Sequence, residues 1–99
     1  MMATDSHAKS VHNTLTSTTA DTVAITGCDV VDVINRHTTE ALWVRYEGDD
    51  SPTTAVAAAD GTDYVAPSGF LRIDAGGTEG GKISIVGNAN PYSVVGVSA

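Results

Sequence analysis

Cysteine is nearly absent from this sequence, and its scarcity limits the chemistry that the chain can perform. Cys28 is the only cysteine, so an internal disulfide and a zinc site built from several cysteines are both excluded. Free cysteines tend to be buried and inert, and we expect Cys28 to lie in the core at the start of a strand. No apolar run approaches the roughly 20 residues that span a membrane, so we expect no membrane partner.

Positive charge is also scarce. The chain has 5 Lys and Arg against 12 Asp and Glu, a formal net charge of −7. The cations are dispersed, as Lys9, Arg36, Arg45, Arg72 and Lys82. Nucleic acid binding requires clustered Lys and Arg, so a nucleic acid partner is not expected. The N-terminus lacks the apolar stretch of a secretory signal, and we expect the chain to be made in a cytoplasm.

Good helix formers are few, whereas strand formers are common. Thr, Ser and Val dominate while Leu, Lys and Glu are scarce, which favours strands over helices. Between Asp29 and Glu47, two apolar-rich runs, 30–34 and 41–46, flank a short polar break. The second run alternates apolar and polar residues with period two, as half-buried strands do. We therefore predict that the two runs form a central β-hairpin.

Further short runs separated by turn residues extend this pattern along the chain. We expect an edge strand within 11–19 and strands near 22–26, 62–66, 70–74, 82–86 and 92–97. The glycine-rich stretch 75–81 is interpreted as a hairpin tip, and 53–59 as a loop that crosses between sheets. The prediction is an all-β fold, a small β-sandwich or barrel of about seven or eight short antiparallel strands. Residues 1–14 are predicted to form an extended N-terminal arm, and residues 15–99 the sandwich domain.

Twelve residues are candidates for the core of this fold. Their number is small for the chain length, so we expect contacts with other subunits to supplement the core. The candidates are Val23, Ile25, Val31, Val33, Leu42, Val44, Tyr46, Phe70, Ile73, Ile83, Ile85 and Val94.

The motifs that carry chemistry are incomplete. Gly76 and Gly81-Lys82 have the spacing of a phosphate-binding loop, but Ile83 stands where Ser or Thr is needed and a strand follows instead of a helix. His7, His12 and His37 lack metal-ligand spacing, and no G-x-S-x-G motif is present. We expect no enzyme activity and no cofactor.

Carboxylates gather in the loops on either side of the alanine-rich stretch. They are Asp49, Asp50, Asp60 and Asp63. A solvated acidic loop is the default interpretation, and a bound cation is the alternative.

Trp43 is the only tryptophan, and it shares a strand face with Arg45 because Leu42 and Val44 point to the other side. Three interpretations remain open: a packing residue on the second sheet face, an anchor in a subunit interface, or a platform for a sugar. Trp and Arg are both enriched in interface hot spots.

Three segments together resemble small β-rich virion proteins of tailed bacteriophages. They are V-V-D-V-I-N-R-H-T-T-E-A-L-W-V-R-Y-E-G-D-D-S-P-T, D-Y-V-A-P-S-G-F-L-R-I, and K-I-S-I-V-G followed by P-Y-S-V-V-G-V. The similarity covers about residues 22–97 and consists of turns and alternation, without a chemical site.

The resemblance implies a minor capsid protein, most directly a capsid decoration or cement protein on the virion surface. Such a chain would bind the outside of the major capsid protein lattice, as a homo-oligomer. A carbohydrate-binding module and a tail or head–tail accessory are the alternatives. The candidate interface residues are Met1, Met2, His7, Lys9, Val11, His12, Trp43 and Arg45.

Overall fold

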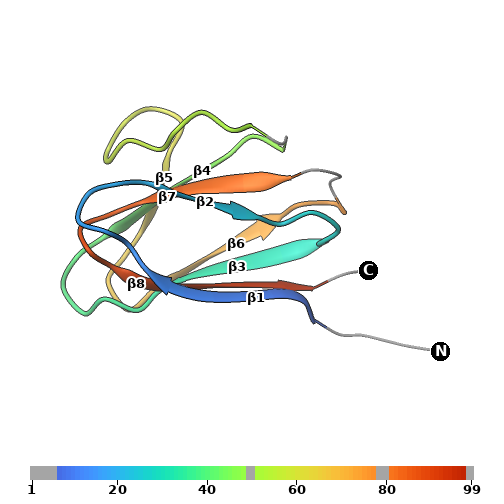
Figure 1. Ribbon diagram of the computed structural model, residues 1–99, viewed down its shortest axis with the longest axis horizontal. Helices are drawn as coiled ribbons and strands as arrows, with labels where there is room; N and C mark the ends of the chain where they lie inside the picture. The colour runs from blue at the N-terminus through green and yellow to red at the C-terminus, as the bar shows by residue number, and fades with distance from the viewer. Residues whose placement is uncertain (1–6, 49–50, 78–80, 98–99) are drawn as a thin grey trace.

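Eight strands in two four-stranded antiparallel sheets make up the fold in the computed structural model, which describes residues 7–48, 51–77 and 81–97 (Figure 1). The strands are β1 (His7–Thr14), β2 (Asp21–Ala24), β3 (Val30–Asn35), β4 (Leu42–Tyr46), β5 (Asp63–Val65), β6 (Phe70–Asp74), β7 (Lys82–Val86) and β8 (Pro91–Val97). No helix occurs within the described ranges. The predicted all-β fold is confirmed, in the form of a sandwich.

The strand order identifies the kind of sandwich. The first sheet has the order β1-β8-β3-β6 and the second has the order β2-β7-β4-β5. This is the order of an eight-stranded jelly roll, an architecture that recurs in viral capsid and lectin domains. The two sheets lie one above the other in Figure 1.

Consecutive strands seldom pair with each other. Every connection between consecutive described strands, except that from β4 to β5, passes from one sheet to the other. The predicted hairpin of residues 30–34 and 41–46 is therefore wrong, since β3 pairs with β6 and β8 whereas β4 pairs with β5 and β7. Both runs alternate because each sends its apolar side chains into the same core from opposite sheets.

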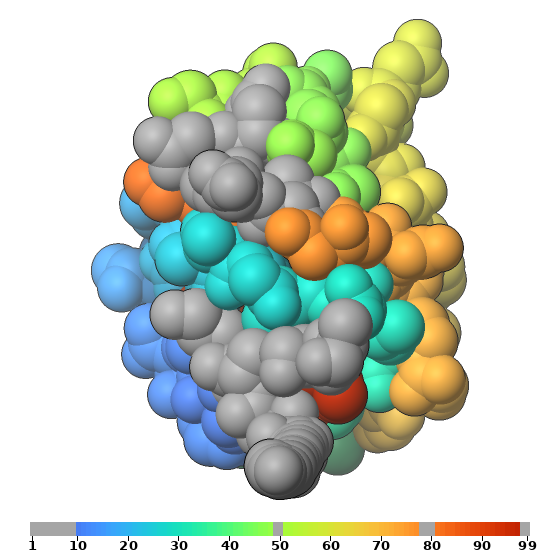
Figure 2. All heavy atoms as spheres, turned by 90° about the vertical axis from the view of Figure 1, so that its right-hand side faces the viewer, coloured from blue at the N-terminus to red at the C-terminus, as the bar shows by residue number. Residues whose placement is uncertain are grey.

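The glycine-rich stretch 75–81 is likewise a crossing between sheets and not the predicted hairpin tip. It leads from β6 in the first sheet to β7 in the second, and its residues 78–80 lie outside the described part. The backbone oxygen of Asp29 accepts hydrogen bonds from the N–H groups of Ala75 (2.7 Å) and Gly76 (3.0 Å). Figure 2 shows this end of the sandwich, where the turn before β3 lies beside the chain that leaves β6.

The core between the sheets matches the prediction closely. Ten of the twelve predicted residues are buried, and Tyr46 is partly buried against them. Cys28 is also buried, as predicted. The prediction is wrong for Phe70, which is 64% exposed. Leu71 and Ile73 of the same strand face inward, and with period two Phe70 must then face outward.

Tyr92 joins the two sheets through the core. Its ring is buried, and its hydroxyl donates to the Oδ2 atom of Asp21 in β2 at 2.8 Å. Burial, followed by this carboxylate, raises the pKa of the Tyr92 hydroxyl above its ordinary range.

The N-terminal region differs from the prediction of an arm over residues 1–14. Residues 7–14 form β1, an edge strand of the first sheet, whose register with β8 runs from His7 opposite Val97 to Thr14 opposite Pro91. Residues 1–6 lie outside the described residues. Strand β1 is held by its backbone pairing with β8, and Val11 is a partly buried residue packed on the core. The strand therefore does not depend on a regular apolar alternation, and its sequence shows little of it.

Candidate functional site

The outward side of the first sheet carries two of the exposed large apolar residues, Phe70 and Val97. Successive side chains of a strand point to opposite faces, so the alternation along each strand shows which side chains point outward. We call this outward surface the open face. It comprises Ser10 and His12 of β1, Val30, Asp32 and Ile34 of β3, Phe70, Arg72 and Asp74 of β6, and Ser93, Val95 and Val97 of β8.

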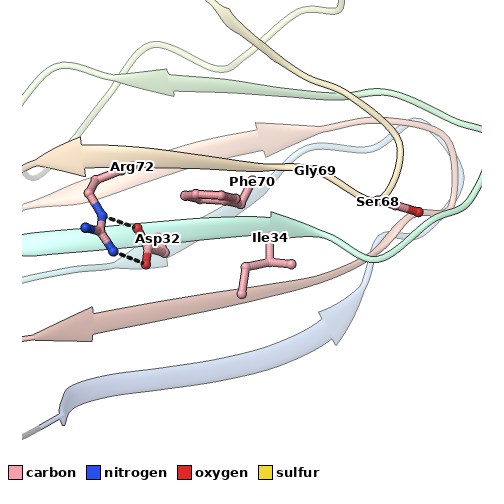
Figure 3. Close-up of a pocket in the computed structure, with 6 residues that line it drawn as sticks. All are labelled: Asp32, Ile34, Ser68, Gly69, Phe70 and Arg72. Atoms are coloured by element: carbon pink, nitrogen blue, oxygen red, sulfur yellow. Dashed lines mark hydrogen bonds and ion pairs between the residues drawn. The ribbon is translucent and has the colours of Figure 1, made fainter.

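Phe70 is the most exposed large apolar residue on the open face. It lies opposite Ile34 in the register of β3 and β6, and Val97, 41% exposed, belongs to the same sheet. Phe70 and Ile34 line a shallow hollow of about 280 Å³, together with Asp32, Arg72, Ser68 and Gly69 (Figure 3). Large apolar side chains exposed beside a hollow are typical of a protein-binding surface.

Asp32 and Arg72 form a two-pronged ion pair beside this apolar area. The guanidinium donates from Nε to Oδ1 at 2.8 Å and from Nη2 to Oδ2 at 2.9 Å (Figure 3). The hydrogen bond from Arg72 holds the pKa of Asp32 below its usual value, and Asp32 in turn raises the pKa of Arg72. The pair therefore fixes the orientation of both side chains on the open face.

A second polar cluster lies toward β1. The Oγ atom of Ser93 contacts the Nδ1 atom of His12 at 2.7 Å and accepts a hydrogen bond from the Nε atom of Arg36 at 2.9 Å. The Nε2 atom of His12 contacts the Oγ atom of Ser10 at 3.1 Å. Ser93 is only 3% exposed beneath these side chains. The cluster thus ties β1 and the chain after β3 to the central strand β8.

The outward side of the second sheet, in contrast, is covered in part by the chain itself. Within the connection from β4 to β5, residues 51–62 arch over this sheet in Figure 1. The N–H group of Ala55 donates to the Oγ atom of Ser84 in β7 at 2.8 Å, and both residues are buried. We call this surface the covered face.

Arg45 holds the covering loop in place. It forms an ion pair with Glu47 and donates to the backbone oxygen of Asp60 at 3.3 Å. Glu47 also accepts a hydrogen bond from the N–H group of Thr53 at 3.2 Å. These bonds, that from Arg45 foremost, lower the pKa of Glu47. Arg45 therefore has a role within the chain, while its proposed place in an interface stays a prediction.

Trp43 lies on the covered face, on the side of β4 opposite Leu42 and Val44, as the alternation predicted. Its ring meets that of Tyr64 edge to face, with centroids 5.1 Å apart. Trp43 is half-buried, and Tyr64 beside it is 56% exposed. This packing accords with the first of the three interpretations, and the other two stay predictions.

The predicted interface residues do not meet in one place. His12 lies on the open face, Val11 points inward, and Trp43 and Arg45 lie on the covered face. His7 and Lys9 are residues of β1, and Met1 and Met2 lie outside the described residues.

The sequence interpretation missed Phe70, Ile34, Asp32 and Arg72 as surface residues. The signal was present in β6, because Phe70 and Ile73 are three positions apart and cannot share one face of a strand.

Within the described residues, no group of three or more His, Cys, Asp or Glu side chains is placed to hold a metal ion. Asp49 and Asp50 of the predicted acidic loop lie outside them. In the same part of the chain, no helix has the length and apolar character required to cross a membrane. Comparison with models of protein families gives no match, and comparison with individual curated proteins gives no significant match.

Proposed function

We propose that this chain is a virion structural protein of a tailed bacteriophage, a capsid decoration protein that binds the outside of the major capsid protein lattice. The proposal rests on the resemblance of its turns and strands to such proteins. A jelly roll with one uncovered face suits a protein that attaches to a larger assembly, although fold alone never decides function.

The observation that carries the proposal is the contrast in charge between the open face and the chain as a whole. The chain has a net charge of −7. On and beside the open face, the positive charges of Arg72 and Arg36 balance the negative charges of Asp32 and Asp74. The exposed ring of Phe70 forms the apolar centre of this face. Docking through this face therefore buries apolar area with little charge repulsion. The open face is our proposed contact with the shell, and neighbouring copies on the lattice form a homo-oligomer.

The test is co-sedimentation of the purified chain with capsids of its source phage from which the chain has been removed. The unmodified chain is expected to sediment with the capsids. Phe70→Glu places a charge at the apolar centre and is expected to weaken binding by at least about tenfold. Tyr64→Glu is the matched control, since Tyr64 has a similar exposure but lies on the other sheet.

Two results would contradict the proposal. If the unmodified chain does not bind capsids, the decoration role fails. If both variants bind as well as the unmodified chain, the open face is not the contact. Locating the chain on intact particles by electron cryomicroscopy separates a position on the capsid from the tail or head–tail alternative.

A further inference from the structure

A second hollow lies beside Trp43, and the decoration role does not involve it. It measures about 260 Å³ and is lined by residues from four connections together with Trp43 of β4. The lining residues are Thr18, Glu40, Ala41, Trp43, Ala57, Gly87 and Asn88. We call it the Trp43 hollow.

One buried side chain organises the rim of the Trp43 hollow. Asn90 is 0% exposed. Its Nδ2 atom donates to the backbone oxygens of Glu40 (2.9 Å) and Ala41 (3.3 Å), and its Oδ1 atom accepts from the N–H group of Asn88 (2.6 Å). The position of Asn90 also explains why residue 87 is a glycine, because a Cβ atom at residue 87 would lie 2.5 Å from the Oδ1 atom of Asn90. Lining residues from two separate connections are thus fixed by a single amide.

Asn35 extends this support on the other side. It is also 0% exposed, and its Oδ1 atom accepts a hydrogen bond from the Nδ2 atom of Asn90 at 3.0 Å. Its own Nδ2 atom donates to the backbone oxygen of Glu40 at 2.8 Å. Burying two carboxamides is costly unless both are hydrogen-bonded. Here the bonds serve to hold the rim of the hollow rigid, which reduces the entropy lost on ligand binding.

The side chains in the hollow are still available to a ligand. Among the described residues, no hydrogen bond engages the Glu40 carboxylate, the Asn88 carboxamide, the Thr18 hydroxyl or the indole N–H of Trp43, although the backbone of Glu40 and Asn88 is bonded and the Trp43 ring packs on Tyr64. The hollow therefore combines an aromatic surface with a hydrogen-bond acceptor, a group that both donates and accepts, and a hydroxyl.

This combination selects the class of ligand. No Lys or Arg lines the hollow and Glu40 carries a negative charge, so phosphates and other anions are disfavoured. One carboxylate is too few ligands for a calcium ion. An aromatic ring flanked by a carboxylate and a carboxamide suits a neutral sugar, whose C–H groups pack on the ring and whose hydroxyls bond to the polar groups. We propose that the Trp43 hollow binds a single neutral sugar ring of a glycan.

The experiment is a titration of the full chain, labelled with ¹⁵N, with a panel of neutral monosaccharides that includes glucose, galactose, mannose and their N-acetylamino forms. At least one sugar is expected to shift the signals of the Trp43 indole N–H and the Asn88 side chain saturably, with a Kd on the order of 1 mM. Asn88→Ala and Glu40→Gln are each expected to weaken this binding by about tenfold.

Asp63→Asn is the matched control, because it removes an exposed carboxylate on the neighbouring strand β5 that does not line the hollow. It is expected to leave the Kd unchanged. The proposal is overturned if no sugar in the panel gives saturable shifts at Trp43 and Asn88. It is equally overturned if binding persists unchanged in both the Asn88→Ala and Glu40→Gln variants. Neither result depends on whether the chain binds capsids.

Discussion

The outward faces of the two sheets differ although the sequences of their strands look alike. Strands in both sheets alternate between buried and half-buried residues. Among the described strands, only β4 and β5 are consecutive and belong to the same sheet, and residues 51–62 between them fold back over its outward face. Alternation thus reports which side chains face the core, whereas the path of a connection decides whether the other side is left for a partner.

The two faces also use polar groups differently. On the covered face, Ser84, Arg45 and Glu47 bond to the loop above them and stabilise the fold. On the open face, Asp32 and Arg72 bond to each other at the surface. Polar substitutions should therefore affect stability more on the covered face than on the open face.

The largest stability effect is expected from Ser84→Ala on the covered face. This change leaves the buried N–H group of Ala55 without its acceptor, at a cost of about 1–3 kcal/mol in the free energy of unfolding. Urea denaturation measures the loss. Ser93→Ala on the open face is the comparison, and a smaller loss is expected because water can reach its exposed partners, His12 and Arg36. Equal losses would remove the distinction between the faces.

A somewhat smaller effect is expected from Gly61→Ala in the covering loop. Gly61 has a φ of +85°, and an added Cβ atom would lie 2.7 Å from the Nη1 atom of Arg45. The left-handed backbone costs roughly 1–2 kcal/mol for a residue with a side chain. Gly27→Ala isolates this backbone cost, since Gly27 has a φ of +83° and nothing within 4 Å of its added Cβ atom.

Thermal and urea denaturation of both glycine variants should show Gly61→Ala as the less stable. The difference between them measures how firmly Arg45 holds the loop. If the two variants are equally stable, Arg45 moves aside freely and does not fix the loop.

The smallest effect is expected from the Asp32–Arg72 pair, because both side chains are partly exposed. The lowered pKa of Asp32 means that the folded state favours the carboxylate. The stability that the pair contributes is therefore present above the ordinary pKa of Asp, about 3.9, and is lost as the pH falls through the lowered pKa.

The unfolding free energies of the unmodified chain and of Asp32→Asn are measured from pH 7 downward at low salt. They should differ by a constant amount near neutral pH, and the difference should disappear as the pH falls below about 4. A difference that grows as the pH falls would contradict the assigned direction of the pKa shift.

The sequence was sufficient to predict the strands and most of the core, because both follow from period-two alternation. Pairing partners were not predictable in this way. Residues 30–34 and 41–46 have a separation that fits a hairpin, but the buried carboxamides of Asn35 and Asn90 hold the intervening turn as a crossing between sheets. An edge strand was expected from residue 11, but residues 7–10 of β1 were assigned only to the arm, because this end of the strand has no apolar pattern.

The candidate surfaces were harder to predict than the fold. Trp43 and Arg45 were correctly assigned to one face, but nothing in their sequence shows that a loop covers that face. Phe70 was assigned to the core because it is aromatic, and only the inward positions of Leu71 and Ile73 place it outside. The Trp43 hollow brings together four separate connections, which no local pattern could have indicated.

The position of β8 has a consequence for synthesis on the ribosome. This strand comes last among the eight, yet it lies between β1 and β3 in the interior of its sheet. Until it has left the exit tunnel, the earliest strand has no neighbour to pair with, and folding during translation must stop short of a closed sandwich. Because its pairings join distant parts of the chain, folding is expected to be slow, in the range of milliseconds to seconds. Nascent chains would meanwhile expose the unpaired edges of β1 and β3, and unpaired edges favour aggregation.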